Sequence, residues 1–298
     1  MAMFWRQKAL LCKVETVYGT DPVPTGAANA ILASDVTISP MEGQDVSREL
    51  ELPYFGAQPT IPTGKHAKLT FAVEVKGAGA ASAGTAPPYG PCLRACGLAE
   101  VIVAGTSVTY NPITVGIESA TFYFNLGGTL FKLTGARGTA TYRVTAQGLA
   151  KLEFEFTGLW VKPVDQALPA VSLAPQLDHK PQVSTTANTP TLTLGTFAPV
   201  TRSLSFALGN AVETRFLIGS ESVLITDHAE TIEMVVEAVP VATFDPYTLA
   251  DAQTLIALTL VHGVGAGRVT AMAGWSRNTG AVSRSRSMTS LPRFLKNC

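Results

Sequence analysis

Apolar and polar residues alternate with a period of two in several segments of the chain. Between residues 68 and 76 every second position is apolar. Segments 139–145, 151–157 and 231–238 repeat the pattern. Successive side chains of a β-strand point to opposite faces, so this period is typical of strands with one face in a core and one in water. The pattern predicts a mainly β fold built from half-buried strands.

Shorter apolar segments predict further strands, while helix signals are few. Gly127 and Gly128 separate two of these segments and are typical of a β-hairpin turn. Two short helices are expected, over residues 91–96 and 246–253, because each segment begins with proline, which fits the first turn of a helix. The shorter strands are expected at residues 120–126, 130–134, 203–208, 223–226 and 255–261.

Two stretches carry neither pattern. Residues 17–33 are rich in turn-forming residues. Residues 44–65 combine glycine and proline with large apolar side chains. Loops are otherwise polar, so a long irregular segment with apolar side chains predicts an arm that docks on a partner. The predicted arm spans residues 44–65, and its expected contact residues are Glu49, Leu50, Leu52, Tyr54 and Phe55.

The segment 166–195 has the composition of a linker and suggests a division of the chain into two β-rich halves. Residues 1–165 would form the first half, with an N-terminal lead and the predicted arm. Residues 196–298 would form the second half and end in a basic tail over 272–298. Strand, turn, alternating strand and short helix follow one another in both halves, which is a weak internal echo.

The overall charge limits the classes of partner. The chain has 298 residues, of which 46 % are apolar and 15 % charged, and its 22 basic and 22 acidic residues give a formal net charge of zero. This composition excludes global disorder and argues against electrostatic binding of nucleic acid or anionic lipid by the whole protein. A lightly charged chain with little net repulsion is expected to cover its surface with copies of itself.

The charge is unevenly distributed along the chain. Residues 252–298 contain six basic and no acidic residues, a net charge of +6. Because the whole chain has a net charge of zero, residues 1–251 have a net charge of −6. A basic tail could bind nucleic acid, but it has few aromatic residues, and the acidic body of a neighbouring copy is the favoured partner. The expected contact residues are Arg284, Arg286 and Arg293.

No segment has the pattern of a signal peptide or a membrane span. The apolar run at residues 9–12 is too short for a signal-peptide core, and no stretch approaches the ~18 apolar residues of a spanning helix. Four cysteines in a chain of this length suggest reduced thiols in a cytoplasmic setting rather than a disulfide framework. No membrane contact is expected.

Metal and cofactor sites are not expected. The four histidines are isolated in the sequence, and neither an HExxH motif nor a Cys/His cluster with metal spacing occurs. Cys92 and Cys96 would share one helix face, but two ligands are too few for a structural zinc site, so buried packing is favoured. Gly263–Gly267 superficially resembles a dinucleotide loop, yet no helix pattern follows it.

Catalytic residues are not expected either. The segment Gly219–Ser222 lacks the second glycine of the G-x-S-x-G motif. Glu153 and Glu155 could form a carboxylate pair of the glycosidase type, as could Glu233 and Glu237, but no aromatic sugar platform lies near them in the sequence. A solvated polar face is the favoured interpretation, and the chain is not expected to be an enzyme.

Several segments resemble the tail tube proteins (major tail proteins) of siphophages, the long-tailed bacteriophages with non-contractile tails. Each segment is weak alone, and their order and spacing carry the resemblance over residues 6–260. The segments are Lys13–Gly26, Ile38–Gly43, Pro87–Gly97, Gly158–Trp160, Ala187–Leu194, Leu208–Asn210 and Ile218–Asp227.

The resemblance implies a β-sandwich or barrel with one or two short helices and extended N-terminal and loop arms. It implies hexameric rings whose inner strands join into one continuous β-barrel, stacked into a hollow tube through which DNA passes into the host. The partners would be further copies of the chain, the tape-measure, terminator and distal tail proteins, and DNA in the lumen without sequence specificity. The protein would lie in the virion tail after assembly in the cytoplasm of the host bacterium.

The resemblance also implies roles for the predicted surfaces. The arm would reach an adjacent ring or subunit. The polar faces of the longest alternating strands would line the lumen, which should be polar and not strongly basic because phosphate contacts retard DNA. The expected lumen residues are Lys68, Thr70, Glu74, Lys76, Lys151, Glu153 and Glu155.

Two alternatives remain open. A tube ring of the type VI secretion kind would have the same fold, but such rings are usually shorter chains without a Pro-rich N-terminal lead. A β-sandwich carbohydrate-binding or carbohydrate-active module would need a cleft with convergent carboxylates and aromatic side chains. The basic, Ser/Arg-rich end at residues 271–298 departs from the family pattern of a closing strand and an acidic terminus, so its expected role rests on charge.

Overall fold

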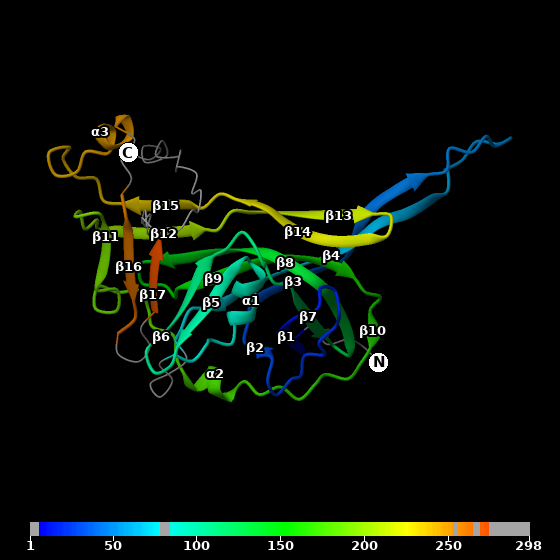
Figure 1. Cartoon of the computed structure of the whole chain (residues 1–298), viewed down its shortest axis with the longest axis horizontal. Helices are drawn as coiled ribbons and strands as arrows, with labels where there is room; N and C mark the ends of the chain where they lie inside the picture. Colours follow the sequence, from blue (N-terminus) through cyan, green and yellow to red (C-terminus); the bar gives the residue numbers. More distant parts are fainter. Residues whose placement is uncertain (1–5, 78–83, 253–255, 265–268, 274–298) are drawn as a thin grey trace.

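The computed structural model of the chain describes residues 6–77, 84–252, 256–264 and 269–273 (Figure 1). These residues form antiparallel sheets with three short helices, which confirms the predicted mainly β fold class. The helices are α1 (Gly90–Ala95), α2 (Ala174–Asp178) and α3 (Pro246–Asp251). The strands are β1 (Lys8–Val14), β2 (Ala30–Ile31), β3 (Ser34–Ser47), β4 (Thr60–Glu74), β5 (Leu98–Val103), β6 (Ser107–Pro112), β7 (Ala120–Leu126), β8 (Thr129–Thr145), β9 (Lys151–Trp160), β10 (Val164–Asp165), β11 (Thr191–Leu194), β12 (Thr201–Ala207), β13 (Asn210–Leu217), β14 (Ser220–His228), β15 (Thr231–Val236), β16 (Leu258–His262) and β17 (Val269–Ala273).

One ten-stranded sheet organises the molecule, and the long strand β8 lies at its centre. The strand order along the sheet is β2-β1-β7-β8-β9-β4-β3. The first part of β8 pairs with β7 and its last part pairs with β12, so β12 and β15 extend the sheet beyond the end of β7. Strands from both predicted halves therefore share one sheet, and the division at residues 166–195 stays a prediction.

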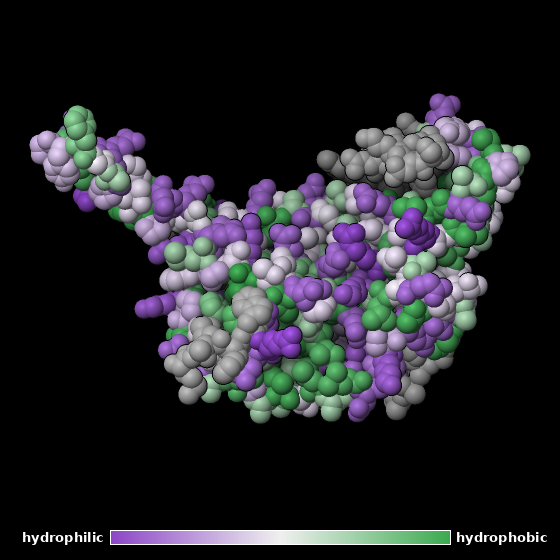
Figure 2. Space-filling view, turned by 180° about the vertical axis from the view of Figure 1, so that it is seen from behind, coloured by the Kyte–Doolittle hydropathy of each residue, from purple (hydrophilic) through white to green (hydrophobic). Residues whose placement is uncertain are grey.

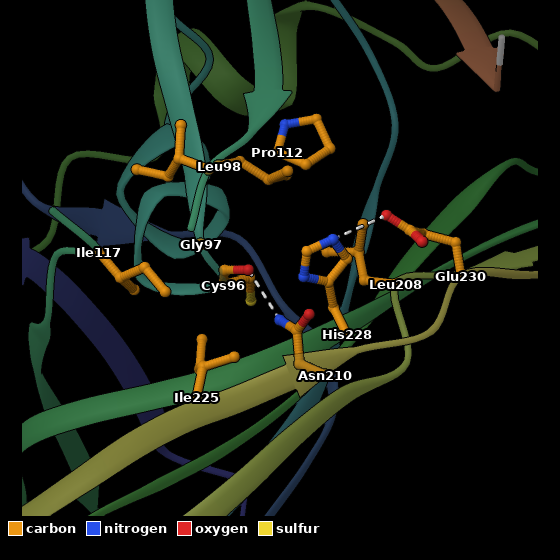
Figure 3. A pocket seen from close by; sticks show the side chains of 11 residues that line it. Cys96, Gly97, Leu98, Pro112, Ile117, Leu208, Asn210, Ile225, His228 and Glu230 are labelled. Atoms are coloured by element: carbon orange, nitrogen blue, oxygen red, sulfur yellow. Dashed lines mark hydrogen bonds and ion pairs between the residues drawn. The ribbon is translucent and has the colours of Figure 1, made fainter. Parts of the chain in front are cut away.

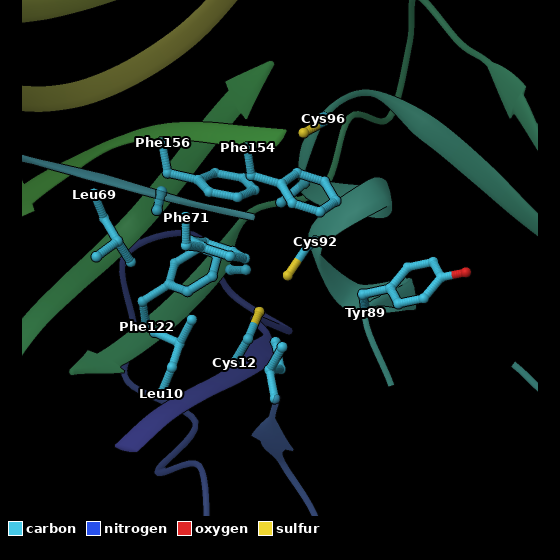
Figure 4. Packing of buried hydrophobic residues seen from close by; sticks show 14 of the residues in the cluster. Leu10, Cys12, Leu69, Phe71, Tyr89, Cys92, Cys96, Phe122, Phe154 and Phe156 are labelled. Atoms are coloured by element: carbon cyan, nitrogen blue, oxygen red, sulfur yellow. The ribbon is translucent and has the colours of Figure 1, made fainter. Parts of the chain in front are cut away.

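The main core lies between this sheet and helix α1 (Figure 4). Phe71, Phe122, Phe154 and Phe156 form an aromatic cluster in which the ring centroids of Phe122 and Phe156 are 4.5 Å apart. The alternation in β4 and β9 directs their large apolar side chains to this side of the sheet. The predicted half-buried strands are thus observed, and their polar side chains lie on the opposite face.

Three free thiols are part of the same core. Cys12 on β1 and Cys92 and Cys96 at α1 are all buried (Figure 4). Burial raises the pKa of the Cys12 and Cys96 thiols well above the usual range. Buried thiols pack as small apolar groups, and the position of Cys92 and Cys96 in the core confirms the packing role predicted for them.

The predicted turn and helices are also observed. Gly127 and Gly128 form the turn of the β7–β8 hairpin, with φ angles of 55° and 101°. Helix α1 starts one residue before the predicted helix 91–96, and Gly97 follows it with a φ of 80°. Helix α3 begins at Pro246 as predicted, while residue 253, the last of the predicted helix, lies outside the described residues.

The prediction of an irregular segment over residues 44–65 is wrong at both ends. Residues 44–47 belong to β3 and residues 60–65 belong to β4, so only residues 48–59 lack regular structure. Residues 44–47 and 60–63 are exposed on both faces, so no apolar alternation marks them. The following strands match none of the predicted strands and were missed: β1, β2, β3, β5, β6, β10, β11, β13 and β17. Of the longer ones, β1 is nearly continuously buried and β13 is mostly exposed, so neither shows an apolar alternation.

A buried carboxylate holds the N-terminal lead against the sheet. Glu15, just after β1, is 7 % exposed and accepts four hydrogen bonds of 2.6–2.7 Å. The donors are the hydroxyls of Ser119 and Thr121 and the backbone N–H groups of Gly19 and Gly135. Gly135 lies in an irregular part of the β7–β8 pairing with a φ of 58°, a conformation that favours glycine. A buried carboxylate needs such donors, so Glu15 joins the lead to β7 and β8.

Tyr18 joins the same lead to the β13–β14 hairpin. Its hydroxyl oxygen accepts a hydrogen bond of 2.6 Å from the N–H of Val223, a fully buried residue of β14. The Arg137 guanidinium lies 5.0 Å from the centroid of the Tyr18 ring and donates to the Val223 carbonyl at 2.9 Å. We call Tyr18, Arg137 and Val223 the junction. The junction fixes where the β13–β14 hairpin crosses the sheet.

Replacing Tyr18 with phenylalanine should lower the free energy of unfolding by about 1–3 kcal/mol, because the buried Val223 N–H loses its acceptor. Urea unfolding at a protein concentration that keeps the chain monomeric measures this change. Tyr54→Phe is the control, since the Tyr54 side chain is exposed and loss of its hydroxyl should change stability by less than about 0.5 kcal/mol. Equal stability of Tyr18→Phe and wild type would contradict the role of the junction.

Candidate assembly interfaces

Six of the seven predicted lumen residues lie on one face of the sheet. Thr70 on β4 lies opposite Glu155 on β9, which in turn lies opposite Thr139 on β8. Glu74 lies opposite Lys151 in the same two strands. Strands β12 and β15 continue this face beyond β8. We call this surface the polar face, and its residues are Lys68, Thr70, Glu74, Thr139, Thr141, Arg143, Lys151, Glu153, Glu155, Ser205 and Glu233.

Acidic side chains outnumber basic ones on the polar face. Arg143 pairs with Glu153 through an Nε–Oε2 distance of 2.7 Å, and Lys151 lies 3.6 Å from Asp35. Glu155 and Glu233 form no ion pair with any residue that the structure describes. Exposed ion pairs such as Arg143–Glu153 and Lys151–Asp35 contribute little to the free energy of folding. Their main effect is on the charge that the surface presents. The polar face therefore has mixed charge, with four acidic and three basic side chains.

Lys76, the seventh predicted residue, lies at the edge of the polar face beside Glu74 and is mostly buried. It follows the end of β4, and its side chain is 11 % exposed. Its ammonium group donates to the carbonyl of Gln176 in α2 and lies 3.6 Å from Glu74. Lys76 therefore attaches α2 to the sheet.

The β13–β14 hairpin covers one end of the polar face. Its Phe216 ring has its centroid 6.3 Å from that of His66 on β4. A Cβ on Gly64, which has a φ of 59°, would lie 3.3 Å from the same ring. The hairpin thus packs on the base of the β3–β4 hairpin, and both hairpins point in the same direction (Figure 1).

The β3–β4 hairpin projects beyond the body of the molecule (Figures 1 and 2). We call residues 44–65 the arm and residues 48–59 its tip. Tyr54 and Phe55 at the tip are 66 % and 108 % exposed. Glu49 and Leu50 are exposed and Leu52 is half-buried. The structure therefore brings the five predicted arm residues together on one protruding tip.

Gln58 bridges the two sides of the tip. Its side-chain oxygen accepts a hydrogen bond of 3.2 Å from the Leu50 N–H, and its side-chain nitrogen donates to the Leu50 carbonyl at 2.9 Å. The Arg48 N–H also donates to the Pro59 carbonyl at 3.3 Å. These bonds hold the tip as one loop, so the apolar side chains are presented together.

The two outer strands of the polar face have open edges. Among the described strands, β3 pairs with β4 alone and β15 pairs with β12 alone. An open strand edge carries unpaired N–H and C=O groups and is a template for pairing with another chain. Both edges are thus candidate contacts between copies.

The cavity beside the β13–β14 hairpin is small (Figure 3). Its volume is about 10 Å³, room for about one water molecule. Asn210, on its wall, donates to the Cys96 carbonyl at 2.7 Å, and His228 lies 3.4 Å from Glu230. The Asn210 bond attaches the hairpin to the end of α1.

The residues that the structure describes lack two further kinds of site. They contain no group of three or more His, Cys, Asp or Glu side chains that could hold a metal ion. Their helices are all too short or too polar to cross a membrane. The predicted contact residues Arg284, Arg286 and Arg293 lie outside the described residues, so their role stays a prediction.

Sequence reasoning did not assign roles to Glu15, Tyr18, Arg137 or Gln58. Glu15 and Tyr18 lie in the segment Lys13–Gly26, which carries part of the family resemblance. The resemblance was thus the available signal for both residues. Arg137 and Gln58 act through partners distant in sequence or across a loop, which no local pattern reveals.

The sequence model of one protein family, described as phage tail tube protein, matches residues 5–289 of the chain. The matched region includes the arm, the polar face and the junction. A search of curated proteins found no match.

Replacing Gln58 with alanine should speed the exchange of the Leu50 amide hydrogen several-fold, because this amide loses its acceptor, while the exchange of β8 stays unchanged. Hydrogen–deuterium exchange read by mass spectrometry measures both. Gln44→Ala is the matched control, since the backbone carbonyl of Gln44 is the group that bonds to Thr63 in the arm. Equal exchange at the tip in the two variants would refute the bridging role of Gln58.

Proposed function

The chain belongs to the phage tail tube protein family, and we propose that it forms hexameric rings whose sheets join into one inner barrel around a channel for DNA. The family makes the protein a structural subunit of the tail tube, located in the virion tail. It is a family of structural proteins and not of enzymes. The number of subunits, the barrel and the passage of DNA are the proposal.

The observation that carries the proposal is the polar face with its two open edges. The six strands β15-β12-β8-β9-β4-β3 are all paired antiparallel. Neighbouring strands run in opposite directions, so β15 and β3, the first and last of the six, are antiparallel to each other. If copies are placed side by side in a ring, β3 of one copy would therefore run antiparallel to β15 of the next copy. Each pairing would satisfy the backbone groups of two edges, and a closed ring would leave no edge exposed. The two edges are offset along the strands: β15 lies level with Thr141–Thr145 of β8, whereas β3 starts at that level and runs away from it. Closure into a barrel requires tilted strands with an offset of this kind.

The polar face would then line the channel. It carries four acidic and three basic side chains, and each of the three basic ones, Lys68, Arg143 and Lys151, is paired with a carboxylate, so they form no cluster of free cations to hold phosphates. Glu155 and Glu233 would repel the DNA backbone, so the DNA would move without being bound. The opposite face of the sheet is covered by α1 and the core and cannot serve as the wall of the channel.

The arm would join one ring to the next. Its tip presents Tyr54 and Phe55 to solvent on a hairpin that leaves the body of its own subunit (Figure 2). Exposed aromatic side chains gain free energy when a partner covers them, and they are typical anchors of protein interfaces. The notable length of β3 and β4 carries these anchors away from the subunit's own core.

Accessibility of a single cysteine tests which surface lines the channel. In a Cys298→Ser background we expect Glu155→Cys to react with a bulky maleimide in free subunits and many-fold more slowly in assembled tubes. Thr109→Cys, on the exposed strand β6, is the control and should react at one rate in both states.

Electron microscopy of the same samples shows whether rings and tubes form. Compact particles without a central channel at every concentration would contradict the proposed function. Tubes in which Glu155→Cys and Thr109→Cys react equally fast would contradict the assignment of the polar face to the channel.

A further inference from the structure

We propose that the arm tip of one copy binds the basic segment 274–298 of a second copy. This inference rests on the proposed function, which requires copies to associate, and it adds the identity of the surface that the arm contacts. The acidic, apolar tip of the arm and the basic sequence of segment 274–298 carry it.

The arm is acidic as well as apolar. Asp45, Glu49 and Glu51 are exposed around the tip, and Arg48 is the one basic residue between residues 44 and 59. None of the three carboxylates forms an ion pair with a residue that the structure describes. The same tip exposes Tyr54 and Phe55. A suitable partner would therefore bring positive charge and groups that pack on aromatic rings.

Segment 274–298 has this chemistry. Its 25 residues include five basic and no acidic residues: Arg277, Arg284, Arg286, Arg293 and Lys296. The arginine guanidinium binds carboxylates through two parallel hydrogen bonds and stacks on aromatic rings, so four arginines could use both features of the tip. Trp275 and Phe294 could cover apolar side chains such as Leu50.

The positions of the two ends favour a second copy over the same copy. The arm leaves one end of the long axis, and β16–β17, which precedes the segment, lies at the other end (Figure 1). Contacts between opposite ends of identical molecules repeat from copy to copy, which suits a stacked assembly. A chain of 25 residues can span at most about 80 Å, enough to reach a neighbour.

Charge reversal and its rescue test the proposal in the full-length chain. One variant carries Glu49→Arg and Glu51→Arg, a second carries Arg284→Glu and Arg286→Glu, and a third carries all four changes. The matched control is Glu213→Arg with Glu221→Arg, two exposed carboxylates of the β13–β14 hairpin, which points in the same direction. Sedimentation velocity measures the concentration at which copies associate, and circular dichroism confirms that each variant is folded.

We expect each of the first two variants to raise the association concentration by roughly tenfold or more at low salt, because rim charges contribute to association and are screened by salt. The four-residue variant should return to within about threefold of wild type, since its charges are complementary again. The control pair should leave association unchanged. In an equimolar mixture of the first two variants, dimers that contain one copy of each variant should be enriched. The reason is that the arm of either variant is opposite in charge to the basic or acidic segment of the other variant, but not to its own.

Three results would overturn the proposal. First, the Arg284→Glu, Arg286→Glu variant could associate at the same concentration as wild type. Second, the four-residue variant could fail to recover the association of wild type. Third, the control pair could impair association as much as the arm pair. The last result would indicate a general effect of surface charge. The variants could also associate as predicted from their charges while electron microscopy shows no rings. That result would support this inference and refute the proposed function, so failure of the one can be distinguished from failure of the other.

Discussion

The junction is the contact on which the arrangement of the outer surfaces depends. Arg137 and Tyr18 satisfy both backbone groups of the buried Val223, and Glu15 holds the segment that carries Tyr18. An unpaired buried backbone group costs free energy comparable to a lost hydrogen bond, so the β13–β14 hairpin has one favourable position. In that position its Phe216 lies against Gly64 at the base of the arm. The N-terminal lead thus determines how the arm is supported.

Strand β8 is the second constraint. Its 17 residues pair with β7 at one end and with β12 at the other, which makes one sheet out of strands from both halves of the chain. The same strand separates a buried aromatic core from a wet polar face, because its side chains alternate between them. A sheet with one covered face, one wet face and two open edges suits a subunit that completes its sheet with copies of itself.

The sequence predicted the parts of this structure that depend on local patterns. Alternation located β4, β8, β9 and β15, and glycines located the β7–β8 turn. The outer parts of β3 and β4 were missed, because a hairpin exposed on both faces has no apolar period. Lys76 shows a second limit of prediction from alternation. Its even spacing from Glu74 places it with the polar-face residues, but its ammonium group donates to the carbonyl of Gln176, a hundred residues away in the sequence. The contacts of Arg137 with Val223 are set by the folded topology and leave no local signal.

Helical reconstruction of assembled tubes by cryo-electron microscopy would show how the strand edges and the polar face lie in the assembly. We expect β3 of each subunit to pair antiparallel with β15 of the next subunit, and Glu155 to face the channel. A tube in which the edges of β3 and β15 face solvent, or in which Glu155 lies on the outer wall, would contradict that arrangement.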